Sequence, residues 1–223
     1  MSKWIIRGEG SLQNDKLHTY IEKLTKERPP LLMEMEQYAE ENGVPIMELV
    51  GIEALLQLLR IQQAKSILEV GTAIGYSALR MALALPESKI VTLERDEERI
   101  KLAGQYIQRS GREEQIIQLT GDALELEQEV KHHGPYDAIF IDAAKGQYQR
   151  FFEMYAPFLK DDGVIVTDNV LFKGLVCEDE IENKRIRSLV KKINLFNEWL
   201  MSHEDYDTVI LPVGDGIAIS KKR

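Results

Sequence analysis

The chain has 223 residues, of which 44% are hydrophobic and 29% charged, and its formal net charge at pH 7 is -9. A single cysteine excludes an internal disulfide, no apolar run approaches the ~18 residues of a membrane span, and the acidic balance argues against a general nucleic-acid coat protein. With no Pro/Gly/Ser-rich linker and no secretion signal, we expect one cytoplasmic domain over residues 1–223 with no membrane partner.

The first 62 residues carry helical periodicity. Three helices are predicted, and breaks at Pro29-Pro30 and Asn42-Gly43 separate them. We expect this segment, residues 1–62, to cover an edge of the sheet or to contact a partner subunit. The predicted helices are Leu12–Leu24, Leu31–Glu41 and Ile46–Leu59.

Residues 63–223 alternate apolar strands with helical segments. This alternation predicts an α/β, Rossmann-like fold with a doubly wound, mostly parallel seven-stranded sheet. A late helix over Asn183–Leu200 turns an apolar stripe inward and a basic face outward. The predicted strands are Ser66–Val70, Lys89–Leu93, Gln115–Leu119, Ala138–Ile141, Val164–Thr167, Thr208–Pro212 and Gly216–Ser220.

A glycine-rich turn follows the first strand. It begins at Glu69 and Gly71 and leads through Tyr76 into a helix, and the second strand ends in Glu94, which is placed to bind both hydroxyls of a ribose. Asp122 and Ala123 close the third strand, where they can hold an adenine ring. The glycines follow the pattern E-x-G-x-x-x-G, without the close pair that a pyrophosphate needs, and S-adenosylmethionine fits this pocket. Tyr76 is expected beside the methionine part of that cofactor.

Oxygen donors end two further strands. Asp142 follows Ala138–Ile141, and the pair Asp168-Asn169 follows Val164–Thr167. Parallel strands present their carboxyl ends at one edge of the sheet, so these groups are expected to converge there. Two carboxylates and an amide oxygen suit Mg2+ or Ca2+ better than zinc. The alternative is that Asp168-Asn169 only caps a loop.

Three stretches carry a family resemblance: Ile67–Ala78, Phe140–Tyr148 and Val166–Val170. They resemble the metal-dependent class I O-methyltransferases of the catechol and caffeoyl-CoA type. Within that family the chain is most similar to the bacterial tRNA 5-hydroxyuridine methyltransferases, through Thr167–Leu175 and Pro212–Ser220.

The resemblance implies residue roles. It implies that Mg2+ is held by Asp142, Asp168 and Asn169, and that Lys145 is the active-site lysine, with Asp142 beside it in the catalytic centre. It also implies a homodimer that methylates the 5-hydroxyl of 5-hydroxyuridine at the wobble position of a tRNA anticodon loop, giving 5-methoxyuridine. The residues implied to contact S-adenosylmethionine are Met47, Ser77, Glu94, Asp122, Ala123 and Asp142.

The chemistry requires an acceptor with two neighbouring oxygens. The C5 hydroxyl and C4 carbonyl of 5-hydroxyuridine form such a pair, as the two oxygens of a catechol do, and a chelated Mg2+ ion would lower the hydroxyl pKa. Lys145 then either takes the proton or stabilises the oxyanion; the alternative is an ordinary surface lysine. Catechol enzymes surround the metal with aromatic side chains, whereas Ala143, Ala144 and Lys173-Gly174 flank it here, so we expect no aromatic wall. A small catechol-like acceptor is the alternative substrate.

An RNA partner requires local positive charge in an acidic chain. The candidates are Lys173, the helix face Lys184/Arg187/Lys191 and the tail Lys221–Arg223, although a merely solvated face is the alternative. Two rival functions remain. A nucleotide-dependent dehydrogenase needs a pyrophosphate loop. A non-enzymatic adenosine-binding module gives no role to Asp142, Asp168, Asn169 and Lys145.

Overall fold

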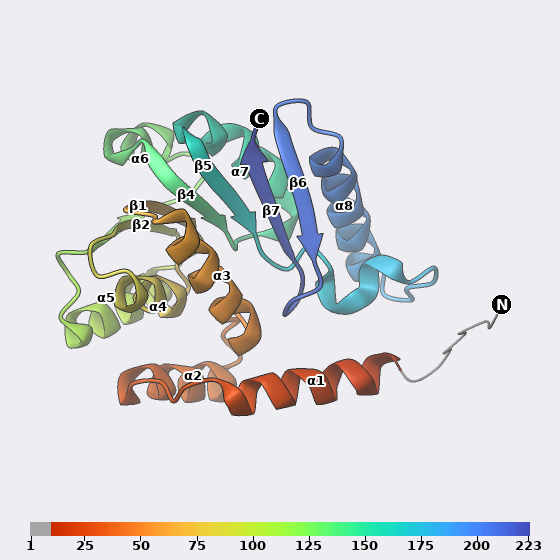
Figure 1. The fold of residues 1–223 in the computed structure, drawn as a ribbon, viewed down its shortest axis with the longest axis horizontal. Coiled ribbons are helices and arrows are strands. Elements are labelled where there is room, and N and C mark those ends of the chain that lie inside the picture. Colours follow the sequence, from red (N-terminus) through yellow and green to blue (C-terminus); the bar gives the residue numbers. More distant parts are fainter. Residues whose placement is uncertain (1–9) are drawn as a thin grey trace.

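The protein is described by a computed structural model that covers the backbone of residues 10–223 and the side chains of residues 16–223. One seven-stranded sheet in the order β3-β2-β1-β4-β5-β7-β6 forms its centre (Figure 1). Only β7 runs antiparallel to its neighbours β5 and β6, which confirms the predicted doubly wound, mostly parallel sheet. The strands are β1 (Ser66–Val70), β2 (Lys89–Glu94), β3 (Ile116–Thr120), β4 (Tyr136–Ile141), β5 (Leu159–Thr167), β6 (Tyr206–Leu211) and β7 (Ile217–Lys222).

Helices cover both faces of this sheet. Helices α2 to α5 pack on one face and helices α6 to α8 on the other (Figure 1). Short 3-10 turns lie at Lys145–Gln147, Ala156–Phe158 and Phe172–Cys177. The α-helices are α1 (Gly10–Leu24), α2 (Pro30–Asn42), α3 (Leu49–Gln62), α4 (Tyr76–Ala84), α5 (Glu97–Ser110), α6 (Glu127–His133), α7 (Tyr148–Tyr155) and α8 (Lys184–Met201).

Each strand divides its side chains between two cores. In β1, Ile67 packs with α2, α3 and α4, whereas the next residue, Leu68, packs with α7 and α8. Successive side chains of a strand point to opposite faces, so a strand buried on both sides is apolar throughout. The helices before β1 therefore share one hydrophobic core with the sheet.

Some element boundaries differ from the prediction. The helix expected to begin at Ile46 begins at Leu49, and Glu48 before it has extended backbone angles. Met47 thus lies outside the helix, and its side chain is buried. Strand β2 continues through Glu94, which makes this carboxylate the last residue of the strand.

Helix α1 lies beside α3, away from the sheet (Figure 1). Four apolar side chains on it, Leu17, Tyr20, Ile21 and Leu24, are between 42% and 66% exposed. Their spacing of three and four residues puts them on one side of the helix. Among the helices of residues 10–223, none has the length and apolar character needed to span a membrane.

Candidate active site

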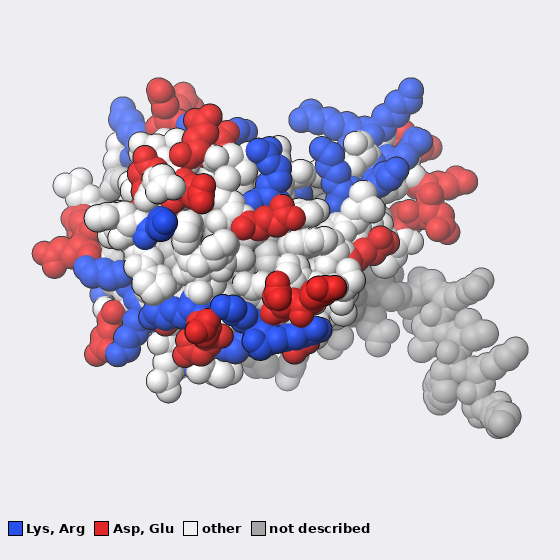
Figure 2. Space-filling view, turned by 90° about the horizontal axis from the view of Figure 1, so that it is seen from above, with Lys and Arg blue, Asp and Glu red and all other residues white. Residues whose placement is uncertain are grey.

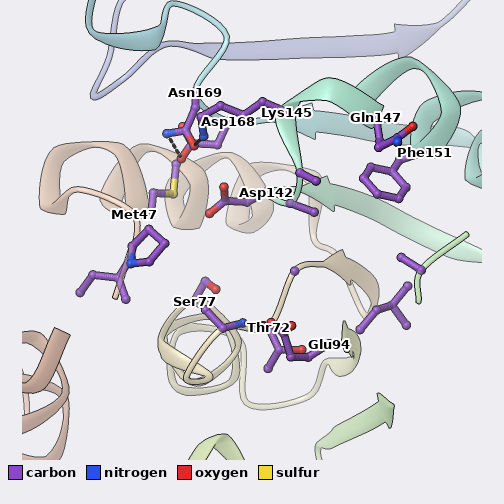
Figure 3. A pocket seen from close by; sticks show the side chains of 18 of the residues that line it. Met47, Thr72, Ser77, Glu94, Asp142, Lys145, Gln147, Phe151, Asp168 and Asn169 are labelled. Carbon is purple, nitrogen blue, oxygen red and sulfur yellow. Dashed lines mark hydrogen bonds between the residues drawn. The ribbon is translucent and has the colours of Figure 1, made fainter. Parts of the chain in front are cut away.

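A cavity of about 630 Å³ opens at the carboxyl ends of β1, β2, β4 and β5 (Figure 3). Nearly all of the residues expected to bind cofactor or metal line it, so the sheet brings together groups that are far apart in the sequence. The residues among them that line the cavity are Met47, Gly71, Tyr76, Ser77, Glu94, Asp122, Ala123, Asp142, Lys145, Asp168 and Asn169.

The glycine-rich turn passes very close to the neighbouring strand. Gly71 has a φ of 111°, and a Cβ atom there would lie 2.0 Å from the carbonyl oxygen of Asp142. Only glycine allows this approach. The turn and the end of β4 are therefore held against each other, and both face the cavity.

Glu94 organises the loops around it as well as facing the cavity. Its Oε2 accepts a hydrogen bond of 2.8 Å from the Ala73 amide, and its Oε1 accepts bonds from the amides of Arg95 and Asp96 at 2.9 and 3.1 Å. These amides fix the carboxylate at the end of β2, between the glycine-rich turn and α5. A carboxylate held in this way is preorganised to accept hydrogen bonds from a ribose.

Glu69, also expected among the residues that contact the cofactor, does not line the cavity. The side chain is fully buried in β1 and accepts hydrogen bonds from the hydroxyls of Ser77 and Thr92. Burial raises the pKa of this carboxyl to about 8, with smaller contributions from the charges of Asp142 and Glu94. Its role is to hold Ser77, which does line the cavity.

Tyr76 and Met47 form the side of the cavity next to the N-terminal helices. Tyr76 is 3% exposed, and its hydroxyl donates to Glu36 Oε1 at 2.6 Å and accepts from Arg80 Nη1 at 2.7 Å. The hydroxyl is therefore engaged with α2 and α4, and the tyrosine joins α2 to the glycine-rich turn. Met47 is 4% exposed and points toward the centre of the site (Figure 3).

Asp122 and Ala123 border the cavity after β3. The Asp122 carboxylate accepts hydrogen bonds from the Leu124 amide at 3.0 Å and from Arg95 Nη1 at 3.2 Å. The carbonyl of Ala123 accepts a hydrogen bond from the buried Tyr155 hydroxyl. These bonds fix the loop, so that one acidic side chain and the backbone next to it face the cavity.

The oxygen donors converge as expected. Asp142 follows β4, and Asp168 and Asn169 follow β5; Asn169 Nδ2 donates to Asp168 Oδ2 at 3.1 Å (Figure 3). Asn169 has a φ of 57°, a left-handed conformation that is uncommon for residues other than glycine. Burial, and then the charge of Asp142, raise the pKa of the Asp168 carboxyl well above its usual range, and burial also raises the pKa of the Asp142 carboxyl.

These residues fit a hard divalent cation. Two partly desolvated carboxylates repel each other, and a cation between them would relieve that repulsion. Within residues 16–223, no three His, Cys, Asp or Glu side chains cluster as a metal site, so the set here is two carboxylates plus the Asn169 amide oxygen. Such all-oxygen donors suit Mg2+.

Lys145 lies on a short 3-10 turn beside this set. Its ammonium group donates a hydrogen bond to Asn169 Oδ1 and lies 5.9 Å from the centre of the Phe172 ring. This position places a cation next to the buried carboxylates and makes Lys145 part of the site instead of a free surface lysine.

The expectation of a site without aromatic walls is wrong. Phe172, three residues after Asn169, lines the cavity with its ring 5.9 Å from Lys145 Nζ, whereas Phe151 of α7 lines it beside Gln147, away from the oxygen donors (Figure 3). The sequence signal was Phe172 itself, which belongs to the same strand-end loop as the metal pair. Phe151 could not be found in this way, because only the packing of α7 brings it to the sheet edge.

Residues 22–223 match the sequence profile of a family described as O-methyltransferase. The chain belongs to this family. It is 32% identical over 222 residues to caffeoyl-CoA O-methyltransferase 2 of Populus trichocarpa, covering 95% of this chain and 90% of the relative. The two cores, the sheet edge and the cavity described above are thus those of an O-methyltransferase.

Solved structures agree with this family. A Staphylococcus aureus protein, proposed to be a caffeoyl-CoA O-methyltransferase, is 37% identical, with a TM-score of 0.86 and coverage of 95% of this chain and 100% of that one. An O-methyltransferase from Bacillus cereus, solved in complex with SAH, is 27% identical, with a TM-score of 0.80 and coverage of 93% and 97%. The fold is therefore the Rossmann-like methyltransferase fold.

Proposed function

We propose that this protein transfers a methyl group from S-adenosylmethionine to one of two neighbouring oxygens of an acceptor, with a divalent cation, Mg2+, at Asp142, Asp168 and Asn169. One observation carries the proposal: the Glu94 carboxylate, the glycine-rich turn and the three oxygen donors line the same cavity. The Bacillus cereus relative bound to SAH supports the choice of cofactor.

The residues divide the work between two halves of the cavity. Glu94, Asp122 and the backbone near Gly71 bind and orient the adenosine end, and Met47 and Ser77 border the path to the acceptor. The cation would supply Lewis-acid polarisation and a fixed orientation of the two acceptor oxygens. Lys145 Nζ takes the hydroxyl proton as a neutral amine or, as an ammonium group, holds the resulting negative charge, and Phe172 shields the reacting atoms from water.

Two acceptors satisfy this chemistry. Similarity to caffeoyl-CoA O-methyltransferases, together with the aromatic ring of Phe172 near Lys145, supports a small catechol-like acceptor. The motif resemblance in Thr167–Leu175 and Pro212–Ser220 supports 5-hydroxyuridine at the tRNA wobble position, giving 5-methoxyuridine. Both acceptors are planar rings with vicinal oxygens, so the same cation and the same lysine can act on either of them.

The basic residues available to an RNA are fewer than the sequence suggests. The tail Lys221–Arg223 ends the antiparallel strand β7 at the edge opposite the site, where Lys222 pairs with Asp161 and Arg223 with Asp207. Figure 2, which looks onto that edge, shows Lys and Arg interspersed with Asp and Glu. Arg187 is also engaged, through hydrogen bonds to the carbonyls of residues 181 and 182.

Basic side chains do remain at the site's own edge. Lys173 is exposed and lines the cavity, and Lys192 Nζ lies 3.4 Å from the Cβ position that Gly146 would have, next to Lys145. Lys184 and Lys191 are exposed on the same helix α8. We infer that a phosphate-bearing acceptor meets the protein along this rim.

The deciding experiment offers two acceptors to the purified protein with S-adenosylmethionine and Mg2+. One is catechol, and the other is tRNA from a strain that lacks 5-hydroxyuridine methylation, analysed as nucleosides by mass spectrometry. Conversion of 5-hydroxyuridine to 5-methoxyuridine with little catechol methylation supports the tRNA acceptor, and the reverse supports the small acceptor. No methylation of either would contradict the proposed reaction.

A charge-reversal pair refines the tRNA assignment. Lys173→Glu with Lys191→Glu is expected to raise KM for tRNA and to reduce its salt dependence, because phosphate contacts supply much of the affinity for RNA. Affinity for S-adenosylmethionine should not change. Lys222→Glu on the opposite edge is the matched control and is expected to have no effect on KM.

We also propose a homodimer formed through α1. The stripe of Leu17, Tyr20, Ile21 and Leu24 is apolar and exposed, and a second copy of the chain would bury it. Light scattering of Tyr20→Glu combined with Leu24→Glu is expected to show a monomer, whereas the unmodified protein is expected to show a dimer.

A further inference from the structure

The Gly214-Asp215-Gly216 turn between β6 and β7 is built for close contact. Gly216 has a φ of 89°, and a Cβ atom there would lie 2.3 Å from Leu171 Cγ and 2.8 Å from the Leu171 backbone nitrogen. Gly214 has a φ of 58°, and its Cβ position lies 3.3 Å from the Cα of Gly51 in α3. The turn is therefore pressed between α3 and the segment that follows the metal pair.

This turn bonds to that segment at three points. The Val170 amide donates to the Gly216 carbonyl at 3.1 Å, and the Leu171 amide donates to the Asp215 carbonyl at 3.0 Å. The Lys173 amide donates to the Asp215 carboxylate. Asp215 thus holds an amide on each side of Phe172, one with its backbone and one with its side chain.

The segment between these bonds has an unfavourable backbone conformation. Phe172, Lys173 and Gly174, named here the arch, have φ values of 45°, 54° and 78°. Left-handed angles at two successive non-glycine residues persist only where surrounding contacts impose them. The bond from the Lys173 amide to Asp215 is a contact of this kind in the middle of the arch.

The arch determines where the Phe172 ring lies. That ring lines the cavity, 5.9 Å from Lys145 Nζ, and the arch begins three residues after Asn169. We propose that Asp215 is a positioning residue that holds the arch so that Phe172 forms one wall of the acceptor site and orients a planar acceptor ring. This inference rests on the proposed function, because it assigns the acceptor to the half of the cavity that contains Lys145.

A competing role for Asp215 is electrostatic. Its carboxylate also faces the cavity of Asp142 and Asp168, so it could act through its charge on a bound cation. Asp215→Asn separates the two roles. Asparagine keeps an oxygen that can accept from the Lys173 amide but removes the charge, whereas Asp215→Ala removes both.

The experiment measures amide hydrogen exchange of the peptide containing residues 170–177, together with KM, kcat, affinity for S-adenosylmethionine and Mg2+ dependence. Asp215→Ala is expected to speed exchange in the arch and to raise KM for the acceptor, each by about tenfold or more, as for loss of a charge-assisted hydrogen bond. Cofactor affinity should stay within about twofold. Asp215→Asn is expected to restore most of both properties.

Two results would overturn the inference. One is unchanged exchange and unchanged KM in Asp215→Ala. The other is an Asp215→Asn variant as defective as Asp215→Ala with weakened Mg2+ dependence, which would show that the charge acts instead. If the unmodified protein methylates neither catechol nor hypomodified tRNA, the proposed function fails, but the exchange comparison still decides whether Asp215 holds the arch.

Discussion

The Lys145 ammonium group donates a hydrogen bond to Asn169 Oδ1, the same oxygen that the donor set offers to a cation. Asn169 in turn donates to Asp168, so lysine, amide and carboxylate form one chain of contacts. An ammonium ion and a divalent cation repel each other at one oxygen. Binding of a cation is therefore expected to release Lys145 from Asn169 toward the acceptor.

This relationship predicts that a substitution of Lys145 has opposite effects on Mg2+ binding and on turnover. Lys145→Met is expected to abolish most turnover while binding Mg2+ at least as tightly as the unmodified protein, because a competing positive charge is removed. Calorimetric titration with Mg2+ and a methyl-transfer assay measure the two properties. Lys131→Met on α6, away from the cavity, is the control. Weaker Mg2+ binding in Lys145→Met would contradict the prediction.

Removal of the cation or of the Asp168 or Asn169 side chain should stop methyl transfer without preventing S-adenosylmethionine from binding. Asp168→Ala, Asn169→Ala and excess EDTA are each expected to abolish turnover and to leave S-adenosylmethionine binding largely intact, while Asp142→Ala harms both. Mg2+ is also expected to raise the Tm of the unmodified protein, since it binds the folded state. Full activity in EDTA would disprove a cation-dependent reaction.

Glu94 is expected to dominate recognition of the ribose. Glu94→Ala should weaken S-adenosylmethionine binding by about 2–4 kcal/mol, because it removes charge-assisted bonds and frees the Ala73 amide at the same time. Glu94→Gln should weaken this binding less, and Glu98→Ala, at an exposed position, should leave it unchanged. If calorimetry showed that both Glu94 variants bind S-adenosylmethionine with unchanged affinity, the adenosine would have to bind elsewhere.

Glu69 should make the protein less stable at alkaline pH. Because burial raises its folded pKa to about 8, above the ordinary 4.5, the folded state binds the extra proton. The stability linked to this proton is complete below pH ~4.5 and is lost as the pH rises through ~8, and between pH 5.5 and 8 it changes by at most roughly 3 kcal/mol.

Glu69→Gln removes this titration. Urea unfolding at pH 5.5 and pH 8.5 is expected to show that the variant gains stability relative to the unmodified protein at the higher pH. A difference between the two proteins that does not change with pH would mean that Glu69 does not titrate in this range.

The Tyr76 hydroxyl should stabilise the contact between α2 and α4. Tyr76→Phe leaves Glu36 and Arg80 without their shared partner, and a free energy of unfolding lower by about 1–3 kcal/mol is expected. Glu113→Gln, at an exposed position after α5, is the control, with a change within ~0.5 kcal/mol. Equal urea midpoints for the two variants would contradict this role.

The order of the strands and most of the residues at the site follow from local sequence patterns. Strand periodicity is local, and the rule that parallel strands share a carboxyl edge brings Gly71, Glu94, Asp142 and Asp168 together without knowledge of side-chain contacts. The same rule placed Asn169 beside them, whereas Lys145 was assigned to the site by the family resemblance. The predictions from the strand rule needed only the order of the elements.

The positions of Glu69, Phe172 and Asp215 depend instead on packing between distant segments. Glu69 lies in the motif but faces the interior, because alternate residues of β1 point to opposite faces and a buried carboxyl finds Ser77 and Thr92 there. Phe172 and Asp215 are 43 residues apart, and their relation depends on the antiparallel return of β7 beside β5. Contacts of this kind come from packing between distant segments, which no local pattern encodes.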